Sequence, residues 1–270
     1  MPHTYECPMR WADMDLLGHV NNVTYLDYVA EARERLFPDS PTGRAPVTRH
    51  RVEFAAPLVF RRRPVLVDSW VTDVGDQTLA LAHEVYDAPG SPDGERVVHA
   101  RVSTELAVRP SASELEVLEG LKAPDHEWRP LADSAPQGGD VYPLTVRRAD
   151  VDEHGLARDV AFFEFLQEAR ITFLMGLHTR GQRWSHHVVA RTDVTYLEPL
   201  AHRREPYAVR SWIGHVGTRS FTIQAEVLDG ERVLAKAAVV MVIFDMETQR
   251  PTDMADAQRA RLLQELGQPS

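Results

Sequence analysis

The sequence has 270 residues, 43% of them hydrophobic, and a formal net charge of −10 at pH 7. It is long enough to bury two ordinary hydrophobic cores, its single cysteine excludes an internal disulfide, and its acidic balance argues against a general nucleic-acid binder. No apolar run approaches the ~20 residues that span a bilayer and no cationic apolar leader opens the chain, so we expect a cytoplasmic protein that binds no membrane.

The first elements predicted along the chain are a short strand over residues 4–11 and a helix over residues 22–37. Between them lies a loop that contains Asp13, Asp15 and Gly18. Spacings of three and four, the period of a helix, relate several helix positions. These positions are Val23, Leu26, Val29, Ala30, Arg33 and Phe37.

Four strands are predicted after this helix, because apolar and β-branched runs alternate with turn residues. They cover residues 47–55, 65–74, 78–86 and 95–108. Residues 114–121 fit a short helix. The next stretch, residues 123–140, carries three prolines and a Gly-Gly pair without periodicity, which indicates a linker.

The second half of the chain repeats the first, which indicates a duplicated domain. The loop residues Arg10, Asp13, Asp15 and Gly18 return 137 positions later as Arg147, Asp150, Asp152 and Gly155. After the helix the offset becomes 142, as for Trp70 and Trp212, and repeat one carries a turn-like insertion at residues 88–93. The elements predicted in repeat two are a strand over 141–148, a helix over 159–177, strands over 187–196, 207–216, 220–228 and 232–244, and a closing helix over 254–266.

A strand, a helix and four strands, present twice, define an α+β class in which each sheet wraps around one long helix. We therefore predict domain 1 over residues 1–122, a linker over 123–140 and domain 2 over 141–270. The strand at 232–244 is apolar almost throughout, which is typical of a strand covered on both faces.

The run from Trp11 to Leu26, WADMDLLGHVNNVTYL, resembles the signature of hotdog-fold thioesterases in the hydroxybenzoyl-CoA thioesterase-like and acyl-ACP thioesterase-like branch. The elements around it follow the order of that fold, and the resemblance covers both repeats. It implies a tandem double-hotdog acyl-CoA thioesterase, with two helices against one continuous antiparallel sheet. It also implies acyl-CoA or an acyl carrier protein as substrate or partner, and neither cofactor nor metal ion.

Thioester hydrolysis needs a nucleophile or base, and donors directed at the oxygen that becomes negative. Asp15 precedes the Gly18 turn and the start of a helix, whose unsatisfied N–H groups can be such donors. By resemblance, Asp15 occupies the family's catalytic carboxylate position, and Gly18 and His19 bring a backbone amide and a second polar group toward the carbonyl. The carboxylate acts either as nucleophile or as general base for water.

Ordinary structural roles also fit these residues. Aspartate and asparagine before a helix form caps and turns, and we expect Asp13 to support the loop, whereas two aspartates exceed what one cap requires and favour chemistry for Asp15. Gly18 meets a backbone requirement under either interpretation. His19 either assists catalysis, as in the acyl-ACP thioesterases, or is structural, since that branch has Asn where this chain has Leu17.

Further residues are predicted to bind substrate near this loop. Asn21 and Asn22 shape the turn, one of them as N-cap. Tyr25 either lines an acyl-binding surface or packs in the core. Glu53 falls near the position of a further carboxylate of the family, although alternation on an exposed strand face explains it as well.

A basic run at Arg61, Arg62 and Arg63 is the candidate site for the phosphates of CoA. Its counterpart in repeat two is His-Arg-Arg at residues 202–204. The alternative is a solvated turn, which is the commoner reason for a basic run.

The second copy of the loop keeps Asp152 and Gly155 but has lost the His-Val-Asn-Asn string. His154 precedes the glycine instead of following it. Either Asp152 forms a second catalytic site or repeat two completes the pocket of repeat one, and we favour the latter.

Three functions fit this sequence: hydrolysis of acyl-CoA or acyl-carrier thioesters, non-catalytic binding of the same molecules, and hydration or dehydration of an acyl chain. The string typical of hotdog hydratases is absent, and no segment outside the repeats supplies the extra module that a sensor needs. Hydrolysis, within fatty acid metabolism, is therefore the leading prediction. We expect at least a weakly held homodimer, because outer sheet edges can pair.

Overall fold

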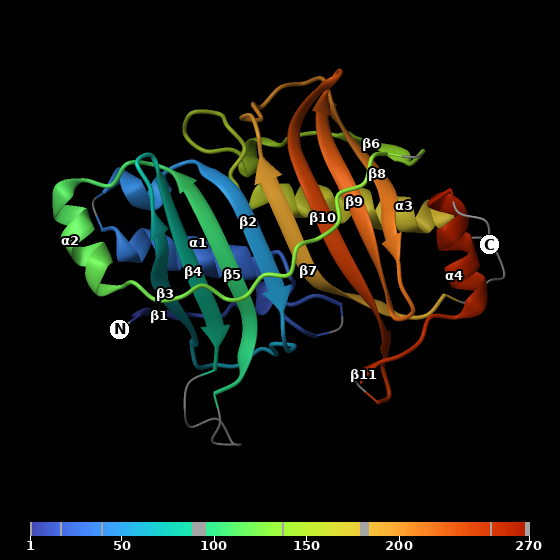
Figure 1. Cartoon of the computed structure of the whole chain (residues 1–270), viewed down its shortest axis with the longest axis horizontal. Coiled ribbons are helices and arrows are strands. Elements are labelled where there is room, and N and C mark those ends of the chain that lie inside the picture. The colour runs from blue at the N-terminus through green and yellow to red at the C-terminus, as the bar shows by residue number, and fades with distance from the viewer. Residues whose placement is uncertain are drawn as a thin grey trace. The chain divides into compact units, whose positions relative to one another are not determined.

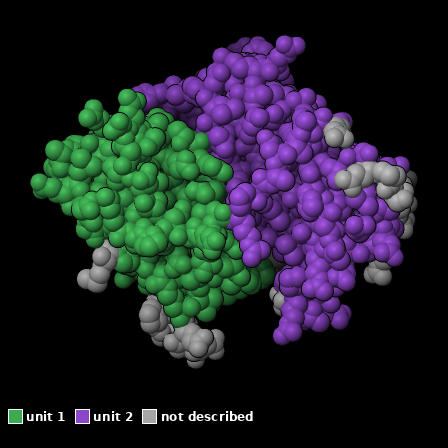
Figure 2. All heavy atoms as spheres, viewed as in Figure 1, with its two compact units in different colours: residues 1–128 green, residues 129–270 purple. Residues whose placement is uncertain are grey.

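The computed structural model describes residues 2–16, 18–38, 40–87, 96–136, 138–178, 184–248 and 250–267. Its contacts divide the chain into two compact units, Met1–Trp128 and Arg129–Ser270, which are coloured separately in Figure 2. Each unit contains one copy of the sequence repeat. The insertion predicted at residues 88–93 lies outside the described residues.

Unit 1 is an antiparallel sheet with a long helix against it (Figure 1). Its elements are β1 (His3–Cys7), α1 (Thr24–Leu36), β2 (Val47–Phe54), β3 (Val65–Val74), β4 (Thr78–Tyr86), β5 (Val98–Ala107) and α2 (Ala112–Gly120), with short 3₁₀ turns at Trp11–Asp13 and Pro41–Arg44. The strand order is β1-β3-β4-β5-β2, and every neighbouring pair is antiparallel. Helix α1 contacts β1, β3 and β4, and α2 contacts β3.

The amphipathic pattern of α1 explains this packing. One side of the helix is buried, including Leu26, Val29, Ala32 and Leu36, and these residues lie three or four positions apart, so they form one stripe. The first strand ends at Cys7, earlier than predicted, because Pro8 has no N–H to donate to the sheet.

Unit 2 repeats this arrangement, and Figure 1 shows its helix α3 along the sheet. The elements are β6 (Asp140–Leu144), α3 (Ala161–Leu177), β7 (His187–Tyr196), β8 (Tyr207–Val216), β9 (Ser220–Asp229), β10 (Arg232–Asp245), β11 (Arg250–Pro251) and α4 (Asp256–Glu265), with a 3₁₀ turn at Arg148–Asp150. The sheet order is β7-β10-β9-β8-β6, again antiparallel, and β11 pairs with β10. The α+β class predicted from the sequence is confirmed.

The segment predicted as a linker is held by side-chain contacts in both units. In unit 1, Trp70 Nε1 donates to the carbonyl of Pro124 at 3.0 Å. In unit 2, Trp212 Nε1 donates to Ser134 Oγ at 3.1 Å. Gly139 has φ +99° and a Cβ there would lie 2.3 Å from the Ser211 carbonyl oxygen, so only glycine fits at this close approach of two backbones.

None of the described helices is both long and apolar enough to cross a membrane. The two long helices start later than predicted, at Thr24 and Ala161. Val23 directly precedes α1 with helical torsions (φ −66°, ψ −41°) and makes no side-chain cap bond; the asparagine that bonds to the helix start is Asn21, whose Oδ1 accepts from Val23 N–H.

Candidate active site

The loop between β1 and α1 is a tight turn closed by backbone hydrogen bonds. Asp15 N–H donates to the His19 carbonyl at 2.7 Å, and Gly18 N–H donates to the Asp15 carbonyl at 3.1 Å. Gly18 has φ +75°, a left-handed conformation that glycine adopts without steric cost. The turn then continues beside the segment after β2, because Val20 N–H donates to the Leu58 carbonyl at 2.7 Å.

The Asp15 side chain both stabilises this turn and faces solvent. Its Oδ1 accepts a hydrogen bond from His19 N–H at 3.1 Å, and the residue is exposed. Because this carboxylate is exposed and held by its own loop, a substrate can reach it without any change in the fold. The geometry is therefore compatible with a nucleophile or a base at Asp15.

Asp13 supports the loop, as expected. Its Oδ2 accepts hydrogen bonds from Arg10 N–H at 2.7 Å and from the Tyr28 hydroxyl at 2.6 Å. Asn21 N–H donates to the Asp13 carbonyl at 2.8 Å. Burial and the bond to Asp13 both raise the pKa of Tyr28, so its hydroxyl stays protonated and donates.

The backbone amides at the start of α1 are largely used within the turn. Asn21 shapes this turn, because its Oδ1 accepts from Val23 N–H at 3.2 Å and its carbonyl accepts from Thr24 N–H at 2.9 Å. The Asn22 N–H, in contrast, has no hydrogen-bond acceptor among the described residues. It is therefore one donor beside this helix start that an external acceptor can meet.

These hydrogen bonds bear on which amide is available as an oxyanion donor. The sequence suggested the Gly18 amide and a group of His19, but the amides of Gly18 and His19 both donate to Asp15. The relevant signal in the sequence is the pair Asn21-Asn22: the first asparagine satisfies two amides of the turn, and the amide of the second is left over.

Tyr25 lies in the core at the beginning of α1. Its ring packs edge-on against Phe54 with centroids 5.5 Å apart. Burial is the main reason why the pKa of Tyr25 is raised, and the negative charges of Asp15 and Asp87 raise it further. The side chain therefore lies within electrostatic reach of the Asp15 carboxylate while its ring packs inside the unit.

Glu53 is not brought to this loop. Strand β2 alternates, with His50 and Val52 buried and Glu53 on the opposite face, where its Oε2 lies 2.9 Å from His126 Nε2. The alternation on a strand face that the sequence suggested accounts for this carboxylate.

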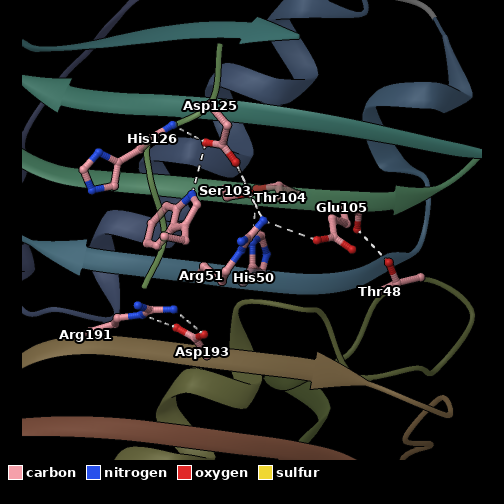
Figure 3. A network of polar contacts seen from close by, with 11 residues as sticks. Thr48, His50, Arg51, Ser103, Thr104, Glu105, Asp125, His126, Arg191 and Asp193 are labelled. Carbon is pink, nitrogen blue, oxygen red and sulfur yellow. Dashed lines mark hydrogen bonds and ion pairs between the residues drawn. The ribbon is translucent and has the colours of Figure 1, made fainter. Parts of the chain in front are cut away.

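The segment that holds His126 belongs to a polar network on the outer face of unit 1 (Figure 3). Arg51 Nη2 donates to Ser103 Oγ at 3.1 Å and lies 3.7 Å from the Asp125 carboxylate. Trp128 Nε1 donates to Asp125 Oδ1 at 3.1 Å, and the Arg51 guanidinium lies 5.2 Å from the Trp128 ring centroid. These contacts fasten residues 123–128 to β2 and β5 and leave Glu53 with a structural role.

The basic run after Val59 is also engaged in structure. Arg61 forms an ion pair with the buried Asp87, and Arg63 lies 3.9 Å from the same carboxylate. His99 Nε2 lies 3.2 Å from Asp87. Arg62, in contrast, is exposed.

The same ion pair occurs in repeat two, where Arg203 Nη1 lies 2.8 Å from Asp229 Oδ1. Arg61 and Arg203 occupy equivalent positions, as do Asp87 and Asp229. A structural pair therefore explains why an arginine recurs here, and Arg62 is the exposed residue of the run.

Apolar side chains surround the Asp15 loop on the surface of unit 1. Trp11 is 76% exposed, Leu16 is fully exposed and Val59 is 41% exposed. The Trp11 ring meets that of Phe60 edge-on, with centroids 5.5 Å apart. We call these four residues the apolar rim. Apolar side chains gathered on a surface mark interaction sites more often than chance placement does.

Repeat two keeps the loop backbone and loses the rim. Asp152 N–H donates to the Leu156 carbonyl at 2.8 Å, Leu156 N–H donates to Asp152 Oδ1 at 3.0 Å, and Gly155 has φ +76°. The positions equivalent to the rim carry Arg148, Glu153, Ala201 and His202. The two loops therefore share one conformation and differ in the surface around it.

Other chemistries find little support among the described residues. Cys7 is buried, and burial followed by the charge of Glu31 raises its pKa to about 12, so its thiol is a poor nucleophile. No group of three or more described His, Cys, Asp or Glu side chains is arranged to hold a metal ion.

Comparison with known proteins identifies the class. The model of the thioesterase-like superfamily matches residues 9–114 and again 146–262, so the chain belongs to this superfamily and contains two copies of its domain. Thioester hydrolysis is the general chemistry to which this membership points. No protein of curated function matches the sequence in a direct search.

Solved structures share the fold over nearly the whole chain. A protein of Lactobacillus plantarum, assigned provisionally as an oleoyl thioesterase, has 13% identity and a TM-score of 0.68, with 91% of this chain and 97% of that chain covered. The 12:0-ACP thioesterase of Umbellularia californica has 14% identity and a TM-score of 0.65, with 93% and 97% covered. An acyl-ACP thioesterase of Bacteroides thetaiotaomicron has 13% identity and a TM-score of 0.63, with 88% and 97% covered. The predicted tandem hotdog fold is thereby confirmed.

Proposed function

We propose that the chain hydrolyses acyl-CoA thioesters to a free acid and a thiol at the Asp15 loop of repeat one. The observation that carries this proposal is an exposed carboxylate, held in the loop before α1 and surrounded by an apolar rim that repeat two lacks. Membership of the thioesterase-like superfamily supports the reaction class.

Asp15 acts on the thioester carbonyl in one of two ways. As a nucleophile, a carboxylate oxygen bonds to the acyl carbon, the carbon–sulfur bond breaks, the thiolate leaves, and water then cleaves the resulting anhydride. As a general base, Asp15 takes a proton from water while the water oxygen bonds to the acyl carbon; the carbon–sulfur bond then breaks, and the leaving thiolate takes up the proton from Asp15. In both routes the carbonyl oxygen becomes negative, and the Asn22 N–H at the helix start stabilises it.

The neighbouring residues receive distinct roles in this proposal. Gly18 permits the turn, and His19 holds Asp15 through its backbone and adds an imidazole beside the carbonyl. Asn21 orders the helix start, and Tyr25 supports the inner wall of the site.

Substrate contacts follow from the surface around the loop. The apolar rim covers the pantetheine arm, and the exposed Arg62 binds a phosphate of CoA. An acyl carrier protein is the alternative donor of the acyl group. The charged surface around Asp152 makes repeat two a scaffold without its own reaction in this proposal.

The test is thiol release from a panel of short, medium, long and aromatic acyl-CoAs. Asp15→Asn should lower kcat at least about a hundredfold, the usual contribution of a positioned acid or base. Asp152→Asn is the matched control, because both aspartates accept the same loop hydrogen bond from the amide four residues on. It should leave kcat near the wild-type value.

Other outcomes contradict the proposal in distinct ways. Comparable losses from both variants would mean two working sites. Binding of acyl-CoA without thiol release, by a protein that also leaves acyl-carrier thioesters intact, would make the chain a binding protein.

A further inference from the structure

A group of polar side chains lies inside unit 1, between α1 and the sheet. His83 on β4 and His50 on β2 are each 1% exposed, and Arg33 on α1 is 6% exposed. Ser69 Oγ lies 2.8 Å from His83 Nδ1, and Thr104 Oγ1 lies 3.1 Å from His50 Nδ1. Buried polar groups cost stability unless they are hydrogen-bonded, so this group requires an explanation.

His83 is the residue whose hydrogen bonding is incomplete. Its Nε2 is buried and has no hydrogen-bond partner among the described residues. Burial, followed by the charge of Arg33 and the proximity of His50, lowers the pKa of His83 to about 3, so the ring is neutral. One nitrogen of a neutral imidazole donates and the other accepts.

Because the ring is neutral, its tautomer decides whether Nε2 needs a hydrogen-bond acceptor or a donor. If the Ser69 hydroxyl donates to Nδ1, then Nε2 carries the proton and needs an acceptor. If Nδ1 carries the proton, Nε2 needs a donor. A hydroxyl group is both donor and acceptor, so it satisfies either tautomer.

Repeat two shows that the fold does not need this histidine. The position equivalent to His83 is Ala225, and that equivalent to His50 is Thr192. Ser211, the equivalent of Ser69, is buried and its Oγ has no partner among the described residues. Repeat one, which carries the apolar rim, is thus also the repeat that keeps a buried imidazole.

The position of His83 relates it to the Asp15 loop. Ser69, His83, Val102 and Val52 are in register and form one row across β3, β4, β5 and β2. Phe54 lies two residues along β2 from this row and packs against Tyr25 at the start of α1. Arg33, whose charge acts on His83, lies eight residues after Tyr25, or about 12 Å along the helix.

We infer that His83 is a specificity-determining residue that binds a hydroxyl group on the middle of the acyl chain. The inference rests on the proposed function and adds one step to it: the acyl group of the substrate extends from the Asp15 loop beneath α1. Because Arg33, whose charge acts on His83, lies about 12 Å along the helix from Tyr25, the hydroxyl belongs well along the chain and not next to the thioester.

The experiment compares octadecanoyl-CoA, 3-hydroxyoctadecanoyl-CoA and 10-hydroxyoctadecanoyl-CoA. The wild-type protein should prefer the 10-hydroxy substrate about tenfold in kcat/KM, which corresponds to about 1.4 kcal/mol. His83→Leu should abolish this preference and retain turnover of octadecanoyl-CoA. Ser69→Ala, which frees the ring from its hydroxyl partner, should weaken the preference, and Ser211→Ala in repeat two is the matched control that should leave it intact.

Binding separates this inference from the proposed function. Calorimetric titration of Asp15→Asn and of Asp15→Asn combined with His83→Leu measures the same preference without hydrolysis. A preference in binding but no thiol release by the wild type would contradict the proposed hydrolysis and support the role of His83. Equal kcat/KM and equal binding for the 10-hydroxy and unsubstituted molecules, or a preference that survives both His83→Leu and Ser69→Ala, would overturn the inference.

Discussion

At the scale of single residues, the Asp15 loop shows that a recurring aspartate has a structural reason to recur. Asp15 and Asp152 both accept a hydrogen bond from the amide four residues later, so the turn itself favours aspartate in each repeat. The residues around the turn, not the carboxylates, distinguish the repeats. The exposed Trp11 and Leu16 of repeat one are replaced by Arg148 and Glu153 at the equivalent positions of repeat two.

His83 makes a residue-scale prediction about pH. Its pKa is lowered in the folded state, to about 3, from an ordinary value of about 6.5 in the unfolded chain. Between these values the unfolded state binds more protons, so the stability that the neutral ring provides is present above pH ~6.5 and is lost as pH falls. His50 and Arg33 face the ring and oppose a further positive charge.

The measurement is urea unfolding of the wild type and of His83→Leu between pH 7 and pH 4. The free energy of unfolding of the wild type should fall more steeply below pH ~6, by up to about 1.4 kcal/mol per pH unit. Parallel curves for the two proteins would show that His83 becomes protonated within the folded state.

At the scale of elements, an ion pair anchors the turn between β2 and β3 in repeat one and its counterpart in repeat two. In unit 1 the Asp87 carboxylate is buried beside Arg61, whereas in unit 2 Asp229 is one-third exposed beside Arg203. A buried carboxylate that loses its partner costs far more than an exposed one. The same sequence feature therefore has different energetic weight in the two units.

Substitution of these arginines tests that difference. Arg61→Met should lower the free energy of unfolding by about 3 kcal/mol, because Asp87 stays buried with only Arg63 and His99 beside it. Arg203→Met should lower the free energy of unfolding by less than Arg61→Met does, because Asp229 is already one-third exposed. Thermal unfolding followed by calorimetry compares the two variants.

Arg62→Met should leave the free energy of unfolding unchanged and raise KM for acyl-CoA. Calorimetry measures the first quantity and thiol release the second; an unchanged KM would remove Arg62 from the proposed phosphate site.

At the scale of the whole molecule, strands β1 and β6 end the sheets of their units. Such strands present backbone groups that can pair with another chain. We predict at least a weakly held homodimer. Light scattering over a dilution series should show a mass that falls toward that of one chain, and a monomer throughout the micromolar range would contradict the prediction.

The sequence by itself determined the duplication, the α+β class, the position of the Asp15 loop and most strand boundaries. Strands β3, β4, β7 and β8 have the predicted ends. These features depend on local patterns: side-chain alternation defines a strand, a three-to-four-residue spacing defines a helix, and Gly18 and Gly155 supply the left-handed turn. The family signature added the reaction class on the same local grounds.

Only the tertiary structure decided which side chains meet. Sequence spacing did not show that Asp87 binds Arg61 or that Glu53 faces His126. Nor did it show that Ser69 and His83 share a buried row, or that the Gly18 amide is used within its own turn. The physical reason is register: a pairing between strands far apart in the chain selects the neighbours of each side chain, and no local pattern encodes that register.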